Sequence, residues 1–255
     1  MATGGGSLIA QASSIIRRRG AVLFGLSLWP FALSFIGIML LVRTVQPAGP
    51  DAQWDPVHVW KSMSWLMRCT WIVCFLSYFY LSPMLALAGI SEIVTADQAG
   101  TELSFGDVLG RVVRALPRLI GLSFAVGILA TFGFEAFVLP GLAVLAITTF
   151  AVPAIMLEGK SMRAAWRRSA SLVRQGRGGV VALGGGLALT LIAIFCVVFA
   201  LGSTSPEAGK FAARVSSLLI PAPVSMVFGT LDALLFLDIR ERASAAARAA
   251  SGASS

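Results

Sequence analysis

The sequence predicts an all-α membrane protein with six transmembrane helices, and three observations support this prediction. The 255 residues are 57% hydrophobic and only 13% charged, with a mean hydropathy of +0.85. In soluble domains about a quarter of the residues are charged. The chain contains long apolar runs, and their length is close to the about 20 residues that a helix needs to cross a bilayer. A basic amphipathic stretch precedes two apolar runs three times, which predicts three repeats of an interfacial helix followed by a two-helix hairpin.

Six apolar runs are the predicted spans of a single polytopic membrane domain that covers residues 1–242. The spans are residues 21–42, 65–90, 119–139, 141–157, 180–201 and 221–239. The first run is longer than the apolar core of a signal peptide and no small-residue cleavage site follows it, so we expect it to remain in the protein. Residues 243–255 are rich in Ala and Ser, which predicts a flexible tail.

The distribution of basic residues predicts the orientation of these spans. If the N-terminus is inside, five of the 20 Lys and Arg residues fall on the outer side, namely Arg43, Lys61, Arg68, Lys210 and Arg214. All the others lie on the inner side, in agreement with the positive-inside rule for short loops. We therefore expect both termini in the cytoplasm.

The basic stretches are predicted to lie flat in the inner headgroup layer, with their apolar faces in lipid. Ser104–Leu116 and Ser161–Val173 have apolar residues at helical spacing, and Ser104 with Asp107 resembles a capping box. The net charge of +8 would suggest nucleic acid for a soluble protein. Beside apolar spans it predicts anionic phospholipid as the partner and no nucleic acid. The predicted headgroup residues are Arg17, Arg18, Arg19, Arg111, Arg114, Arg118, Arg163, Arg167, Arg174 and Arg177.

Asp232 is the most informative polar residue inside a predicted span. It lies seven residues before the inner end of the last span, about 10 Å deep at 1.5 Å per residue. Charged groups at this depth are costly and often mark transport pathways. Two interpretations remain open: a neutral, structural carboxyl group bonded to a neighbouring helix, or a functional group of a transporter.

Two sets of small residues predict faces on which helices approach each other closely. Ser123, Gly127 and Thr131 recur every four residues on the third span, and Gly184, Gly185 and Gly186 lie on the fifth. Both faces fit either packing within the protein or contact with a partner protein.

The sequence contains none of the common catalytic patterns. It has no P-loop, no HExxH, no nucleophile elbow and no pair of carboxylates at a catalytic spacing. His58 is the single histidine, and the three cysteines lie in apolar runs without metal-ligand spacing. We therefore expect no enzymatic activity, no cofactor and no metal site.

One segment resembles a known family. Val152–Gly159, with the sequence VPAIMLEG, and the later Arg168–Ser169 and Leu172–Val173–Arg174 are similar to a motif of an uncharacterised bacterial and archaeal integral-membrane superfamily. This superfamily includes the membrane domain found beside some glycerophosphoryl diester phosphodiesterases. Leu139–Pro140–Gly141 and Leu237–Asp238–Ile239–Arg240 resemble further landmarks of the family, so the resemblance covers roughly residues 100–242. It implies six helices and an accessory or lipid-associated role. The phosphodiesterase activity belongs to a separate domain and is not implied here.

The sequence thus favours a non-enzymatic accessory, scaffold or assembly subunit of the bacterial inner membrane. Its expected partners are anionic phospholipid and another membrane protein. The alternative is a transporter of a small solute or lipid that uses Asp232, because repeated helical units with a site near the midplane are common in transporters. A single deep acid and few other polar residues make a poor translocation path, so the accessory role is preferred.

Overall fold

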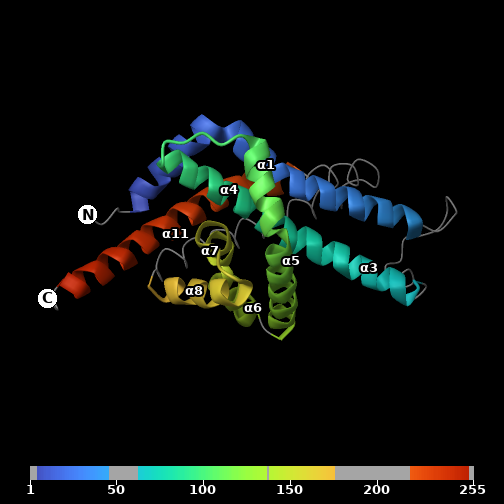
Figure 1. Cartoon of the computed structure of the whole chain (residues 1–255). Coiled ribbons are helices and arrows are strands. Elements are labelled where there is room, and N and C mark those ends of the chain that lie inside the picture. The colour runs from blue at the N-terminus through green and yellow to red at the C-terminus, as the bar shows by residue number, and fades with distance from the viewer. Residues whose placement is uncertain (1–4, 46–62, 137, 176–218, 253–255) are drawn as a thin grey trace.

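The computed structural model describes residues 5–45, 63–136, 138–175 and 219–252, and all regular structure in these ranges is helical. A π-helical segment, η1 (Ser77–Leu81), joins two of the α-helices without interruption. The α-helices, shown in Figure 1, are α1 (Gly5–Val45), α3 (Trp65–Leu76), α4 (Ser82–Gln98), α5 (Phe105–Ala136), α6 (Val138–Thr148), α7 (Ala151–Glu158), α8 (Met162–Gln175) and α11 (Pro221–Gly252). The all-helical prediction is confirmed for the described residues.

Four helical stretches in the described part of the chain are long and apolar enough to cross a membrane. They are Ser7–Gly37, Trp65–Gln98, Phe105–Gly133 and Pro221–Ala246. Large apolar side chains are exposed along them, including Trp65 at 78% and Phe132 at 67%. Soluble proteins rarely expose much apolar surface in one place. These helices therefore have the composition and the surface of a membrane protein.

The predicted fourth span, residues 141–157, is not a single helix. The structure divides it into α6 and α7, with a break at Thr149–Phe150. The predicted fifth span, residues 180–201, lies outside the described residues, as do Arg177 and Gly184–Gly186. The count of six spans, the threefold repeat and the cytoplasmic termini therefore remain predictions.

The first two basic stretches do not form separate helices as predicted. In these two units the basic stretch and the following apolar run belong to one continuous helix, α1 or α5, whereas the run that follows α8 lies outside the described residues. Pro117 lies within α5 and does not end it, because proline removes only one helical hydrogen bond. The apolar faces of these stretches are also buried in the protein rather than directed into lipid, through Ala12 and Ile15, Val108 and Val112, and Ala165 and Leu172.

Helix α1 lies antiparallel to the continuous helix made by α3, η1 and α4. Their contacts pair Arg18 with Asp97, Leu26 with Gly89, and Ser34 with Ser82, so residue numbers rise on one side as they fall on the other. At Gly89 an added Cβ would lie only 3.2 Å from Leu26, so glycine allows the close approach. The first predicted hairpin is therefore present within the described residues.

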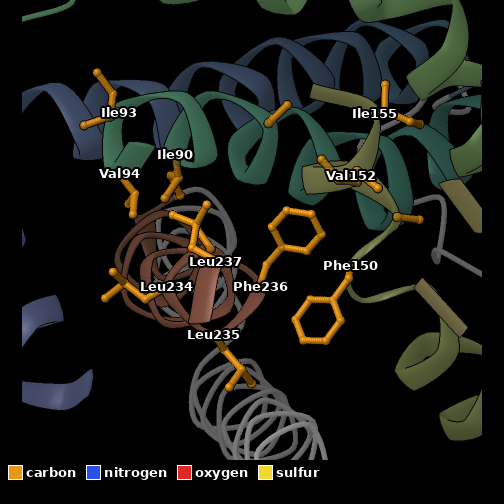
Figure 2. Close-up of a cluster of buried hydrophobic side chains, with 14 of the residues drawn as sticks. Ile90, Ile93, Val94, Phe150, Val152, Ile155, Leu234, Leu235, Phe236 and Leu237 are labelled. Atoms are coloured by element: carbon orange, nitrogen blue, oxygen red, sulfur yellow. The ribbon is translucent and has the colours of Figure 1, made fainter. Parts of the chain in front are cut away.

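Helix α11 completes the core by packing on α1 and α4. The face that carries Gly229 lies against Ile90, and Phe236 meets Phe150 with ring centroids 5.9 Å apart. Figure 2 shows these rings next to each other beneath α4, with Leu237 directed towards Ile90 and Val94 of α4. Helix α11 continues through the Ala-rich segment, where a flexible tail was predicted, as far as Gly252, because alanine has the highest helix propensity.

Candidate functional site

The basic stretches and the neighbouring helix ends form a charged surface on which several arginines form ion pairs with carboxylates. The pairs are Arg18–Asp97 (2.7 Å), Arg19–Glu102 (2.9 Å), Arg111–Glu92 (2.7 Å), Arg168–Glu158 (3.3 Å) and Arg242–Asp238 (2.7 Å). The first four pairs tie α1 to α4 and to the loop that follows it, α5 to α4, and α8 to α7, and the fifth lies within α11. The basic stretches are thus fixed to the protein by charge as well as by apolar packing.

Six of the predicted headgroup arginines have no such partner. Within the described ranges no carboxylate lies within ion-pair distance of them, and all six are exposed: Arg17, Arg114, Arg118, Arg163, Arg167 and Arg174. Of the predicted set, Arg18, Arg19 and Arg111 are engaged in the ion pairs above. An excess of positive charge therefore remains on this surface.

Three of the predicted residues line one cavity, of about 500 Å³, beside the first half of α5. Arg111, Arg114 and Arg118 come from α5, Glu92 from α4, and Gly159 from the end of α7. We call this cavity the α5 hollow. A second hollow of about 440 Å³ lies on the other side of Arg111 and Arg114 and is also lined by Asp107.

Local sequence positions both walls of the α5 hollow. The predicted capping box is confirmed at the start of α5: the Asp107 N–H donates to Ser104 Oγ (3.2 Å), and the Ser104 N–H donates to Asp107 Oδ2 (3.1 Å). Gly159 ends α7 in the left-handed conformation with φ of 63°, which a residue with a side chain rarely adopts. Its carbonyl accepts a hydrogen bond from Arg118 Nη1 (3.4 Å).

Glu92 is a site residue that sequence reasoning missed. It lies just beyond the predicted second span, is only 6% exposed, and accepts a hydrogen bond from Arg111 Nη1 at 2.7 Å. Its partner is 19 residues away on the next helix, so neither helical spacing nor a motif marks the pair. The available signal was a carboxylate directly beyond an apolar run, close in sequence to the next basic stretch.

Asp232 is placed in the core, as expected for a residue deep in the last span. Its side chain is only 7% exposed, and neither carboxyl oxygen has a hydrogen-bond partner among the described residues. The same holds for the buried Ser27 hydroxyl of α1. The predicted bond from Asp232 to a neighbouring helix is therefore not seen in the described ranges.

The small-residue face of the third span packs within the chain. An added Cβ at Gly127 would lie 3.0 Å from the ring of Tyr80, which belongs to η1. The Tyr80 hydroxyl hydrogen-bonds Thr131 Oγ1 (3.3 Å), and Ser123 is buried on the same helix. This face is occupied by the protein itself and does not provide a surface for a partner.

Ser169 of α8 joins the two halves of the broken fourth span. Its hydroxyl accepts a hydrogen bond from the Phe150 N–H (3.0 Å) and donates one to the Ile147 carbonyl (2.6 Å). Buried backbone groups that no helix satisfies require such partners. Sequence reasoning missed this role, since a serine on an amphipathic helix gives no sign of the backbone that it contacts.

The described residues contain no group of three His, Cys, Asp or Glu side chains that could hold a metal ion. The class of protein that the fold and this charged surface define is a helical membrane protein with a basic surface. No protein-family model, curated protein or solved structure matches the chain.

Proposed function

We propose that the protein is a non-enzymatic accessory subunit of the bacterial inner membrane that binds anionic phospholipid at its basic inner end and contacts another membrane protein. The observation that carries this proposal is the set of exposed arginines without carboxylate partners, next to helices with apolar surfaces. Each basic residue near an anionic bilayer contributes about 1 kcal/mol of attraction. The resemblance at Val152–Gly159 to a superfamily of lipid-associated membrane domains supports the same role.

Extraction of the protein from its native membrane in a mild detergent tests this proposal. Mass spectrometry of the purified material should find anionic phospholipid enriched over its fraction in the membrane, together with one stable protein partner. A monomer without lipid enrichment that moves solute across liposome membranes would favour the transporter instead.

The orientation of the proposed six-span protein is also testable, in a variant without native cysteines. Cysteines placed at Ser7 and Ser255 should be protected from impermeant thiol reagents in intact cells, because positive-inside loops keep both termini in the cytoplasm. A cysteine at Ala52, between the first two spans, should be labelled. Labelling of either terminus would refute the proposed topology.

The transporter is the second candidate function, because the buried Asp232 carboxyl group has no hydrogen-bond partner among the described residues. A transporter needs this group to ionise or to exchange ligands, whereas a scaffold needs neither. Asp232→Asn abolishes ionisation at nearly constant size, and Asp232→Leu also removes the polar group.

For an accessory subunit we expect Asp232→Asn to preserve the phenotype of the wild-type strain. We expect Asp232→Leu to preserve stability or to raise it by about 1–3 kcal/mol, because it removes a buried polar group that has no hydrogen-bond partner among the described residues. Complementation of a deletion strain and thermal unfolding in detergent measure the two effects. An Asn variant that is expressed and stable but fails to complement would support the transporter.

A further inference from the structure

We infer that the α5 hollow is a discrete site for the phosphate group of one anionic phospholipid, whose acyl chains lie along the exposed apolar stripe of α5. This inference rests on the proposed function and narrows it from a generally basic surface to one site. Four observations support it: the charge of the hollow, its free donors, its shape and the surface next to it.

The hollow carries a net positive charge that its own carboxylate does not cancel. Glu92 is the one carboxylate among its lining residues, against three arginines. Because Glu92 binds Arg111 at 2.7 Å, the guanidinium groups of Arg114 and Arg118 supply the uncompensated charge. An anion in the hollow would therefore meet two free cations.

These two guanidinium groups are held in place and still have donors to offer. Arg114 Nε donates to the Gly110 carbonyl (3.2 Å), and Arg118 Nη1 donates to the Gly159 carbonyl (3.4 Å). A guanidinium group has five N–H donors, so most remain unused by the described residues. Paired N–H donors in a planar fork match the geometry of phosphate oxygens.

The shape of the hollow suits a headgroup. Its volume of about 500 Å³ falls in the usual range of small-molecule sites. Gly159 forms one wall, and open space lies where its Cβ would be, so no side chain from this corner blocks the arginines. Ile155 and Met156 of α7 add apolar surface to the lining.

The surface next to the hollow favours a lipid over a free phosphate compound. Ala125, Leu129 and Phe132 lie on the same face of α5 as Arg118. Ala125 is partly exposed, and Leu129 and Phe132 are 48% and 67% exposed. They form an apolar stripe that begins about two turns beyond Arg118. A ligand with a phosphate group at the arginines and acyl chains on this stripe would contact both surfaces at once.

The test compares two double variants of the intact protein in a neutral detergent, with dioctanoyl phosphatidylglycerol as the ligand. We expect R114Q/R118Q to bind it about 30-fold more weakly, which corresponds to about 1 kcal/mol per arginine. The matched control, R240Q/R248Q, removes the same charge from exposed positions of α11 that lie outside the hollow and outside the predicted headgroup set. We expect it to change affinity less than about threefold.

The other outcomes separate this site from the general function. An equal loss of lipid affinity in both double variants would refute a discrete site and would indicate diffuse attraction of lipid to the basic surface. Wild-type affinity in both variants would refute both the site and the lipid-binding function. Deacylated glycerophosphoglycerol should bind far more weakly than the lipid, and equal binding would contradict the role of the stripe. If the double variant does not fold, R114Q alone should weaken binding of the lipid about fivefold, which corresponds to about 1 kcal/mol.

Discussion

Replacement of Gly133 by alanine should destabilise the protein by about 1–3 kcal/mol, the usual range for overpacked cores. The new Cβ would lie 2.7 Å from the backbone nitrogen of Gly141 and 2.9 Å from its Cα. Backbone atoms cannot rotate away as the end of a side chain can, so α5 and α6 would have to separate. Loss of van der Waals contact along the helix pair is the physical cause, and thermal or denaturant unfolding in detergent measures it.

Gly110→Ala is the matched control for this change. Gly110 lies on the same helix, with nothing within 4 Å of its added Cβ. Alanine there should be neutral or stabilise the helix by up to about 1 kcal/mol, because it has the higher helix propensity. If Gly133→Ala were as stable as Gly110→Ala, the close approach of α5 and α6 at this level would be wrong.

The helical class and the apolar stretches could be predicted from the sequence because they depend on local composition. Apolar runs of the required length leave a helix as one of few ways to satisfy the backbone in lipid. The predicted spans at residues 21–42, 65–90, 119–139 and 221–239 all fall largely inside the long helices. The capping box at Ser104 and Asp107 was predictable for the same reason, since it involves residues three apart.

The errors concern contacts between distant residues. The sequence showed that the basic stretches are amphipathic, but hydrophobic periodicity does not distinguish a face buried in lipid from one buried in protein. Val112 and Leu172 are covered by other helices, so the chain keeps these stretches against its core. The helix ends were also misplaced, because neither Pro117 nor the Ala-rich segment after Arg242 interrupts its helix.

In the candidate site, too, local features could be predicted and contacts between distant residues could not. Arginines 111, 114 and 118 could be selected from their spacing, since positions three and four apart share one face of a helix. Their different roles could not be predicted, because of the three only Arg111 binds Glu92 and only Arg118 contacts Gly159. Which arginine stays free for a ligand depends on tertiary contacts with α4 and α7.

Ser169 is the residue at which a small change should affect the fold most directly. Its hydroxyl is fully buried and satisfies both a backbone donor at Phe150 and a backbone acceptor at Ile147. These groups flank the break between α6 and α7, where the helix does not satisfy them itself. Leaving a buried polar group without a partner costs about 1–3 kcal/mol.

Ser169→Ala should therefore lower the free energy of unfolding by about 2 kcal/mol or more. Ser171→Ala is its matched control, because Ser171 lies on the same helix and its hydroxyl bonds only the Arg168 carbonyl one turn earlier. We expect that change to be close to neutral. Phe150 packs against Phe236, so loss of the Ser169 contact should also loosen α7 from α11. Hydrogen exchange at the Phe150 amide would reveal this directly, and unchanged protection in Ser169→Ala would contradict the proposed role of the hydroxyl.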